Sequence, residues 1–348
     1  MIVVQVLVFV AGAVLVLAVA LSALRTVVLP RGQSARISRW VFLSTRRLFD
    51  LRARLADSYD ARDRIMAIYA PISLVVLAGT WILLVVLGFA ALFWATGAPT
   101  WRSALAVSGS SVTTLGLDHP ANSVDSGLAV AEAIIGLGLV ALLISYLPSI
   151  YSSFQRRELP VALLEVRAGD PPNVVDLLVR HHRIGSTDRL KTLFSDWEVW
   201  FADVEETHTS LSALCFFRSP LPGRSWVTAA GAVLDTAAMV QSTVAEGSYP
   251  EAALCIRAGS LSLRRIAASF AIDFDPDPAP TDPISIDRRE YDEACAALEA
   301  VGMALRPDRE QSWRAFAGWR VNYDRVLIAL AGLTMAPYAP WSSDRSLC

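Results

Sequence analysis

Residues 111–118 read SVTTLGLD, a short polar stretch between two long apolar segments. Thr113 and Thr114 precede Gly116, and Asp118 closes the stretch. Small hydroxyl residues, a glycine and a carboxylate are unusual between segments that could each cross a membrane. The role of residues 111–118 between these apolar segments is therefore central to the function of the chain, and the surrounding sequence limits which roles are possible.

The composition places the chain among membrane proteins. Of its 348 residues, 54% are hydrophobic, and its mean hydropathy is +0.43. These values are too apolar for an ordinary soluble enzyme and indicate membrane spans joined to a polar domain. The net charge of −2 argues against nucleic acid as a partner, because phosphate binding needs a concentrated basic surface. The cysteines have no metal-ligand spacing, and we interpret them as core or surface thiols: Cys215, Cys255, Cys295 and Cys348.

Three segments are long and apolar enough to span a bilayer: residues 2–24, 71–94 and 126–148. The first lacks a positively charged start and is longer than the apolar core of a signal peptide, so we interpret it as an anchor. Basic residues concentrate on one side of the spans, and the loop between the second and third spans has only Arg102. This asymmetry predicts an N-terminus outside and a C-terminus in the cytoplasm of a cell with a bacterial-type inner membrane. The residues that carry this asymmetry are Arg25, Arg31, Arg36, Arg39, Arg46, Arg47, Arg62, Arg64, Arg156 and Arg157.

Residues 25–66 link the first two spans and mix apolar residues with arginines and aspartates. The pattern predicts an amphipathic helix. It would either lie at the inner membrane surface, with its arginines near anionic lipid, or pack on the cytoplasmic domain.

The loop between the second and third spans is too short for a domain and too polar for a simple connection. We therefore expect this loop and its two spans to form a pore domain over residues 67–152. Residues 100–112 (TWRSALAVSGSSV) predict a short helix that enters the bilayer and returns. Such backbone survives at membrane depth only when it is buried in protein or lines a water-filled cavity. Along residues 67–152 the expected elements are a span, a short helix, an extended threonine-glycine segment and a second span, which is the order found in pore-loop cation channels.

Residues 103–120 (SALAVSGSSVTTLGLDHP) resemble the pore helix and filter of the potassium channel superfamily, whose motif is Thr-Thr-Val-Gly-Tyr/Phe-Gly-Asp. Thr113, Thr114 and Gly116 match it, Leu115 replaces its valine, and Leu117 stands at the aromatic position. The resemblance covers residues 70–152 and implies a homotetramer, since each chain supplies a quarter of a ring. It implies a filter at residues 113–118, in which oxygens of Thr113, Thr114 and Leu115 coordinate permeant K⁺ or Na⁺, and it implies no cofactor.

The second filter glycine is missing from this sequence. Either Asp118 occupies its position, or that position is deleted and Asp118 matches the motif's aspartate; His119 and Pro120 disturb the spacing further. In both cases the inner half of the filter can form and the outer half is non-standard, which predicts weaker discrimination between potassium and sodium. Four copies of Asp118 facing the axis would form an acidic ring that attracts cations.

The last span contains three features that we expect to support or gate the pore. Glu132 is costly inside a membrane, and we expect a hydrogen bond to the backbone of the pore helix or filter rather than contact with ions. Gly136, with Gly138, is either a gating hinge or a site of close helix packing. Pro148 is expected to bend or end the helix near the cytoplasmic gate.

Residues 153–348 predict a helical cytoplasmic domain of five to seven helices, with a proline-rich surface loop at 273–287. No glycine-rich turn follows a strand, so a dinucleotide ligand is not expected. Glu205 and His208 have the spacing of a bundle metal motif, but it occurs once and we interpret it as a solvated helix face. We likewise interpret His181 and His182 as the end of a helix rather than as proton sensors.

Taken together, the sequence predicts an all-α membrane protein with three spans, a re-entrant pore helix and a helical cytoplasmic domain. We expect a cation channel in contact with membrane lipid, with no enzymatic activity, and with an unidentified ligand or protein acting on the cytoplasmic domain. The alternative is a non-conducting scaffold or sensor that kept the channel architecture and whose cytoplasmic domain binds a partner.

Overall fold

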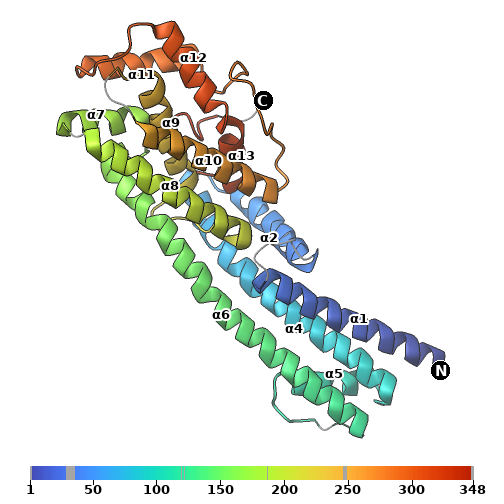
Figure 1. Cartoon of the computed structure of the whole chain (residues 1–348). Coiled ribbons are helices and arrows are strands. Elements are labelled where there is room, and N and C mark those ends of the chain that lie inside the picture. The colour runs from blue at the N-terminus through green and yellow to red at the C-terminus, as the bar shows by residue number, and fades with distance from the viewer. Residues whose placement is uncertain are drawn as a thin grey trace. The chain divides into compact units, whose positions relative to one another are not determined.

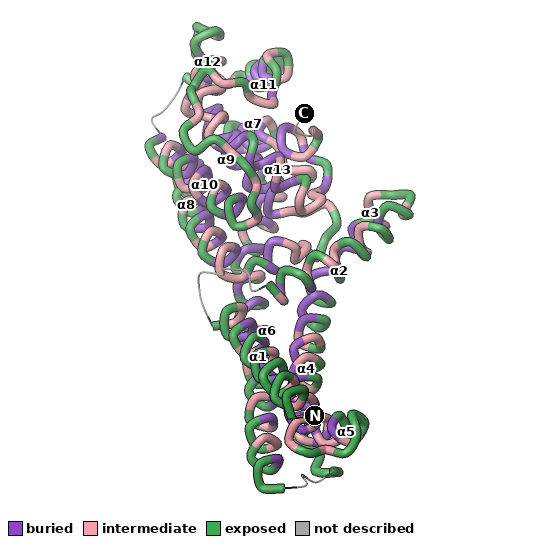
Figure 2. The backbone as a smooth tube through the Cα atoms, turned by 90° about the vertical axis from the view of Figure 1, so that its right-hand side faces the viewer, coloured by how far each residue is buried: buried purple, intermediate pink, exposed green. Residues whose placement is uncertain are grey.

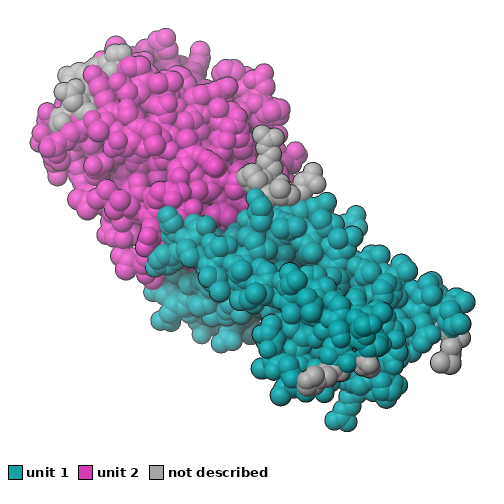
Figure 3. Space-filling model, turned by 60° about the horizontal axis from the view of Figure 1, so that its bottom comes forward, with its two compact units in different colours: residues 1–152 teal, residues 153–348 magenta. Residues whose placement is uncertain are grey.

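The computed structural model describes residues 2–28, 36–118, 120, 122–185, 187–245 and 249–345. The predictions made for Arg31, His119 and Cys348 fall outside these residues. The chain divides into two compact units, Met1–Ser152 and Ser153–Cys348 (Figure 3). Over the described residues the regular elements are all helices, apart from a single isolated β-bridge between Val244 and Leu305, which confirms the predicted all-α class.

Three helical segments among the described residues are long and apolar enough to cross a membrane: Ile2–Val27, Tyr59–Thr96 and Ser123–Ala168. They correspond to α1 (Ile2–Val27), to α3 (Tyr59–Ala67) followed by α4 (Tyr69–Thr96), and to α6 (Ser123–Ala168), which begins in the first unit and ends in the second (Figure 1). The three predicted membrane-spanning segments are therefore confirmed as helices of suitable length and composition.

Helices α1 and α4 approach each other closely through glycines. A Cβ placed on Gly12 would lie 2.7 Å from the carbonyl oxygen of Gly88, and one on Gly88 would lie 2.6 Å from Val16 Cγ2. Trp81 Nε1 also donates a hydrogen bond to Ser22 Oγ across the pair, at 3.3 Å. Since apolar helices gain no hydrophobic free energy from each other in lipid, small residues that permit close packing are what hold such pairs together.

The linker between the first two spans forms two helices instead of the single amphipathic helix expected over 25–66. Helix α2 (Arg36–Arg54) ends before a short break, and Ser58 then caps α3 by accepting a hydrogen bond from the Ala61 amide at 3.2 Å. Serine competes for backbone donors at such positions and starts a new helix. Arg46 pairs with Asp50 and lies over the Tyr69 ring, while Tyr69 donates to the carbonyl of Phe42, so α2 is fixed to the start of α4.

Helix α6 passes through Pro148, so the prediction that the inner helix ends there is wrong: it starts at Ser123 instead of 126 and continues to Ala168 instead of 148. A proline removes one backbone donor, and α6 contains a second proline at Pro160. The helix continues because the rest of its hydrogen-bond ladder outweighs the two missing donors.

The second unit contains the end of α6 and seven further α-helices among its described residues. They are α7 (Val174–Ile184), α8 (Thr187–Ser210), α9 (Trp226–Ser242), α10 (Pro250–Ser269), α11 (Arg288–Ala300), α12 (Arg309–Arg320) and α13 (Asp324–Thr334), with a 3₁₀ turn at Ser212–Phe216. The expected proline-rich loop at 273–287 is irregular in the structure. Helix α9 is buried along nearly its whole length and forms the centre of the core (Figure 2).

Candidate functional site

The loop at residues 113–118 follows helix α5 (Trp101–Val112), which packs against α4 (Figure 1). Thr100 begins α5 with a capping box, in which its hydroxyl accepts from the Ser103 amide at 3.1 Å and Ser103 Oγ accepts from the Thr100 amide at 3.3 Å. Two donors at the start of the helix are thereby satisfied without water. The helix ends at Val112, directly before the two threonines.

The sign of the backbone angle φ alternates from one residue to the next after α5. Thr113 is right-handed, with φ −88° and ψ −2°, Thr114 has φ +56°, and Gly116 has φ +68°, while Leu115 between them has negative φ. Positive φ suits glycine, but in a threonine it costs about 1 kcal/mol, so Thr114 is a strained position that neighbouring contacts must maintain.

The amides of the loop point back to the last turn of α5. Those of Thr114 and Leu115 donate to the carbonyls of Ser111 and Ser110, both at 3.0 Å. Those of Leu117 and Asp118 both donate to Ser110 Oγ, at 2.9 and 3.3 Å. The Ser110 hydroxyl therefore holds the second half of the loop. The sequence did not single out Ser110.

The carbonyl oxygens of the loop have no such partners. None of the carbonyls of residues 113–118 accepts a hydrogen bond from a residue that the structure describes. The Thr114 hydroxyl is equally without a described partner, whereas the Thr113 hydroxyl donates to the carbonyl of Gly109 at 2.6 Å. Of the oxygens predicted to contact ions, the three carbonyls and the Thr114 hydroxyl are thus available, and the Thr113 hydroxyl is engaged within its own helix.

Glu132 links α6 to α5 through a side chain rather than through the backbone. Its carboxylate is fully buried, and Ser108 Oγ lies 2.5 Å from Glu132 Oε1 and 3.0 Å from the carbonyl oxygen of Val86. Glu132 Oε2 has no hydrogen-bond partner among the described residues. Helices α4, α5 and α6 therefore converge on one serine hydroxyl.

Gly136 lies against the end of α5. A Cβ at this position would come within 2.7 Å of the Val112 carbonyl oxygen and 2.8 Å of its Cγ2, whereas a Cβ on Gly138 would meet nothing within 4 Å. Both glycines lie inside the uninterrupted helix α6. Of the two readings of Gly136, the contacts favour close packing over a hinge, and they place this packing one residue before the loop.

The outer end of α6 is tied to α4 by a buried carboxylate. Asp125 is 3% exposed, accepts from the Thr96 hydroxyl at 2.5 Å, and accepts from Asn122 Nδ2 at 3.0 Å. Asn122 in turn accepts from the Asp125 amide at 2.8 Å. The two ends of the loop are thus both anchored, at Ser110 by α5 and at Asn122 by α4 and α6.

The second unit contains a buried cluster that the sequence did not predict. Arg157 is fully buried and donates to Glu158, to the carbonyls of Leu214 and Phe217, and to His208. The prediction of a solvated face at Glu205 and His208 is wrong for His208, which has no exposed surface, although Glu205 does pair with Arg265 at the surface. Only the packing of α6 against α8 could reveal this burial.

The electrostatics of this cluster keep His208 neutral. Burial and the adjacent Arg157 guanidinium hold the pKa of His208 well below its usual value. Arginine has only donors, so the Nε2 atom of His208, 3.2 Å from Arg157 Nη1, must act as acceptor. Burial also raises the pKa of the Cys215 thiol, which is therefore an unreactive core residue.

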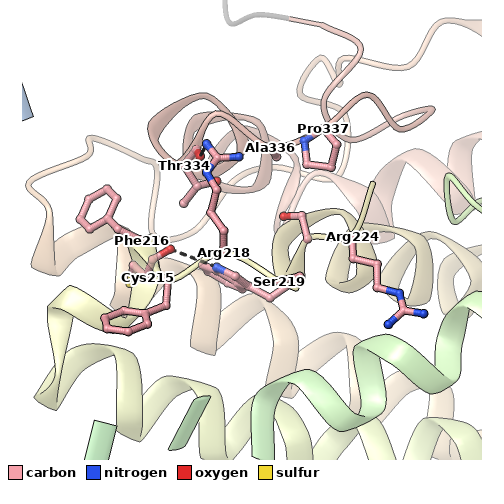
Figure 4. Close-up of a pocket in the computed structure, with 11 residues that line it drawn as sticks. Cys215, Phe216, Arg218, Ser219, Arg224, Thr334, Ala336 and Pro337 are labelled. Carbon is pink, nitrogen blue, oxygen red and sulfur yellow. Dashed lines mark hydrogen bonds between the residues drawn. The ribbon is translucent and has the colours of Figure 1, made fainter. Parts of the chain in front are cut away.

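A small hollow in the second unit does not form a convincing ligand site. It is lined by Cys215, Phe216, Phe217, Arg218, Ser219, Arg224, Ser225, Trp226, Thr334, Ala336 and Pro337 (Figure 4) and has room for about one water molecule. Arg218 points to the carbonyl of Thr334, at 2.7 Å, and Arg224 points away to pair with Glu165. Within the described residues no group of three His, Cys, Asp or Glu side chains could hold a metal ion.

Comparisons of the chain with protein-family models, with curated proteins and with solved structures found no match.

Proposed function

We propose that this chain forms a tetrameric, potassium-channel-like cation channel whose ions pass along residues 113–118. The single observation that carries the proposal is the loop backbone: every amide except that of Gly116 donates to α5, and the carbonyls have no partner among the described residues. Residues 113–118 are all exposed in the single chain, so their carbonyls are open to an ion or to other copies of the chain. A row of unpaired carbonyls between membrane-spanning helices is an arrangement that a dehydrated cation would satisfy.

Four copies are needed because one loop supplies only one side of a coordination shell. The exposed side of α6 supports such an assembly. Val130, Ile134, Leu137 and Ile144 are each 61–67% exposed and recur every three, four or seven residues, so they lie on one side of the helix. Packing of these side chains around a common axis would place four loops around the same axis.

The proposed pore conducts passively and catalyses no reaction. Its inner half would offer the carbonyls of Thr113, Thr114 and Leu115 and the free Thr114 hydroxyl. Its outer half lacks the second glycine, and Leu117 is 77% exposed. We therefore propose conduction of K⁺ with weak discrimination against Na⁺, in an inner membrane with the C-terminus in the cytoplasm, as the distribution of arginines favours.

The test is cation flux into liposomes that contain the purified full chain, measured for K⁺ and for Na⁺. Thr114→Ala should reduce K⁺ flux by removing the one free hydroxyl of the loop. Gly116→Ala should reduce it by forcing a side chain into positive φ, at a cost of about 1 kcal/mol or more. Gly79→Ala is the matched control, because a Cβ at Gly79 would meet nothing within 4 Å.

Flux that is lost in both loop variants and kept in Gly79→Ala would support the loop as the conduction path. Flux that is unchanged in the loop variants would overturn it. A wild type that stays silent, even after removal of residues 169–348, would favour the non-conducting scaffold instead.

A further inference from the structure

Helix α2 carries an exposed apolar strip along one side, formed by three large side chains. Trp40, Leu48 and Leu51 are 66%, 69% and 62% exposed. At 3.6 residues per turn, their spacings place them on the same side of the helix. The other side is buried against the rest of the first unit and includes Ser38 and Thr45. An exposed strip of large apolar side chains on a helix indicates an interaction surface.

A row of arginines runs beside this apolar strip. Arg36, Arg47 and Arg54 are all exposed, and their spacings correspond to about three turns and about two turns of the helix. Arg47 comes one helical turn before Leu51, so the arginine row adjoins the strip. None of the three arginines forms an ion pair with a residue that the structure describes, and the only acidic residue of α2, Asp50, is already paired within the helix. This side of α2 therefore combines apolar surface with unpaired positive charge.

Contacts within the first unit place α2 at the same end of two membrane-spanning helices. Thr26, in the last turn of α1, has its hydroxyl oxygen 2.7 Å from Ser38 Oγ of α2. Tyr69, the first residue of α4, donates to the carbonyl of Phe42 at 3.2 Å. The apolar strip and the arginine row are therefore at the level where the hydrocarbon of a bilayer ends and its headgroups begin, a boundary at which tryptophan is enriched.

We propose that the apolar strip and the arginine row of α2 bind the surface of a bilayer that contains anionic lipid. The strip enters the boundary between acyl chains and headgroups, and the long arginine side chains reach the lipid phosphates. Two copies of this surface repel each other because both carry the same charge, whereas an anionic leaflet attracts it. Of the two placements that the sequence allows for residues 25–66, this is the one at the membrane. The proposal needs the membrane-spanning helices but does not depend on conduction.

Fluorescence quenching by nitroxide-labelled lipids tests the proposal on the full chain in liposomes. A single cysteine carries a fluorescent label in a Cys348→Ser background, since the described cysteines are buried. Leu51→Cys is the test position, Leu17→Cys in α1 gives the signal of a residue in the span, and the exposed Glu293→Cys in α11 gives that of a residue in water. In liposomes of phosphatidylcholine and phosphatidylglycerol, we expect quenching at position 51 to be close to that at position 17.

The role of the arginine row is tested by combining Arg47→Gln with Arg54→Gln in the labelled Leu51→Cys chain. Each arginine near an anionic surface contributes about fivefold to binding, so the ratio of bound to free α2 should fall about fivefold for each arginine removed. Arg289→Gln with Arg314→Gln is the matched control, because it removes the same charge from exposed positions of the second unit. Liposomes of phosphatidylcholine alone should reduce quenching at position 51 in the same way as the double variant.

Strong quenching at position 51 that needs both phosphatidylglycerol and the two arginines supports the proposal. Quenching at position 51 as weak as that at position 293 overturns it and shows that α2 packs on protein instead. Strong quenching that is unchanged without phosphatidylglycerol, or unchanged in the double arginine variant, overturns anionic lipid as the partner. None of these results depends on ion flux, so failure here is distinguishable from failure of the proposed channel.

Discussion

The loop at 113–118 and the buried cluster around Arg157 differ in whether their polar groups have hydrogen-bond partners within the chain. Each donor of the Arg157 guanidinium that faces the core finds an acceptor, among them Glu158 and the carbonyls of Leu214 and Phe217. In the loop five of the six amides are satisfied, and the carbonyls have no described partner. The first pattern is that of a group whose task is to hold a fold together. The second leaves hydrogen-bonding capacity for something outside the chain.

The contrast extends to how each region is held. The second unit relies on pairs of opposite charge inside a large core, including Arg320 with Asp235 and Asp324. The loop relies on one hydroxyl at Ser110, one close glycine contact at Gly136 and one strained residue at Thr114. Changes in the second unit should therefore alter stability, and changes around the loop should alter conduction.

The largest effect is expected for Arg157→Met. It leaves the Glu158 carboxylate and two carbonyls buried without their partner, which costs about 3–5 kcal/mol of unfolding free energy. The adjacent Arg156→Met removes a pair with Asp203 whose arginine is 52% exposed, and such pairs contribute about 0–1 kcal/mol. Chemical unfolding followed by tryptophan fluorescence measures the free energy of unfolding of both variants. Equal losses of unfolding free energy would contradict a special structural role for the buried arginine.

Gly136→Ala should come next, with an overpacking cost of about 1–3 kcal/mol, because the new methyl meets the Val112 backbone oxygen. We expect K⁺ flux to fall about tenfold, since Val112 immediately precedes the loop. Gly138→Ala is the control on the same helix and should leave flux unchanged. A larger effect at Gly138 than at Gly136 would favour a hinge over close packing.

Two buried histidines, His208 and His181, should contribute to the pH dependence of stability, because burial lowers the pKa of both. The pKa of His208 is about 6.5 in the unfolded chain and lower in the folded one, so the unfolded state binds an extra proton as pH falls below about 6.5. His208 therefore destabilises the folded state on acidification, by about 1 kcal/mol between pH 7.5 and about pH 5.5. His208→Gln should remove this part of the pH dependence in thermal unfolding, and the exposed His182→Gln should not. An unchanged pH profile in His208→Gln would refute this assignment.

The smallest effect is expected for Ser110→Ala, which removes the shared acceptor of the Leu117 and Asp118 amides. The bonds are only part-buried, so we expect a loss of about 1 kcal/mol, the lower end for an unsatisfied donor. This corresponds to a change of about fivefold in the K⁺ to Na⁺ flux ratio. Ser111→Ala is the matched control, since its hydroxyl donates only to Val107 within the helix. Equal ratios in the two variants would show that Ser110 does not hold the loop.

Much of the candidate site could be anticipated from local sequence. Glycine is the residue type that adopts positive φ without strain, and Gly116 does so. The positive φ of Thr114 could not be anticipated, because threonine avoids this conformation unless distant contacts impose it. Ser108 and Ser110 were recognisable only as small hydroxyl residues, since the partner of a hydroxyl depends on which helix packs against it.

The sequence by itself determined the helical class and the three segments able to cross a membrane. Both follow from local properties of the sequence, namely the length of the apolar segments and the 3.6-residue spacing of apolar residues. Only the tertiary structure decided that Gly136 touches Val112, that Ser108 meets Glu132, and that Arg157 is buried beside His208. It also decided that α6 continues through Pro148. These outcomes depend on contacts between residues far apart in sequence, whose packing free energy outweighs the local preference of a glycine, a charge or a proline.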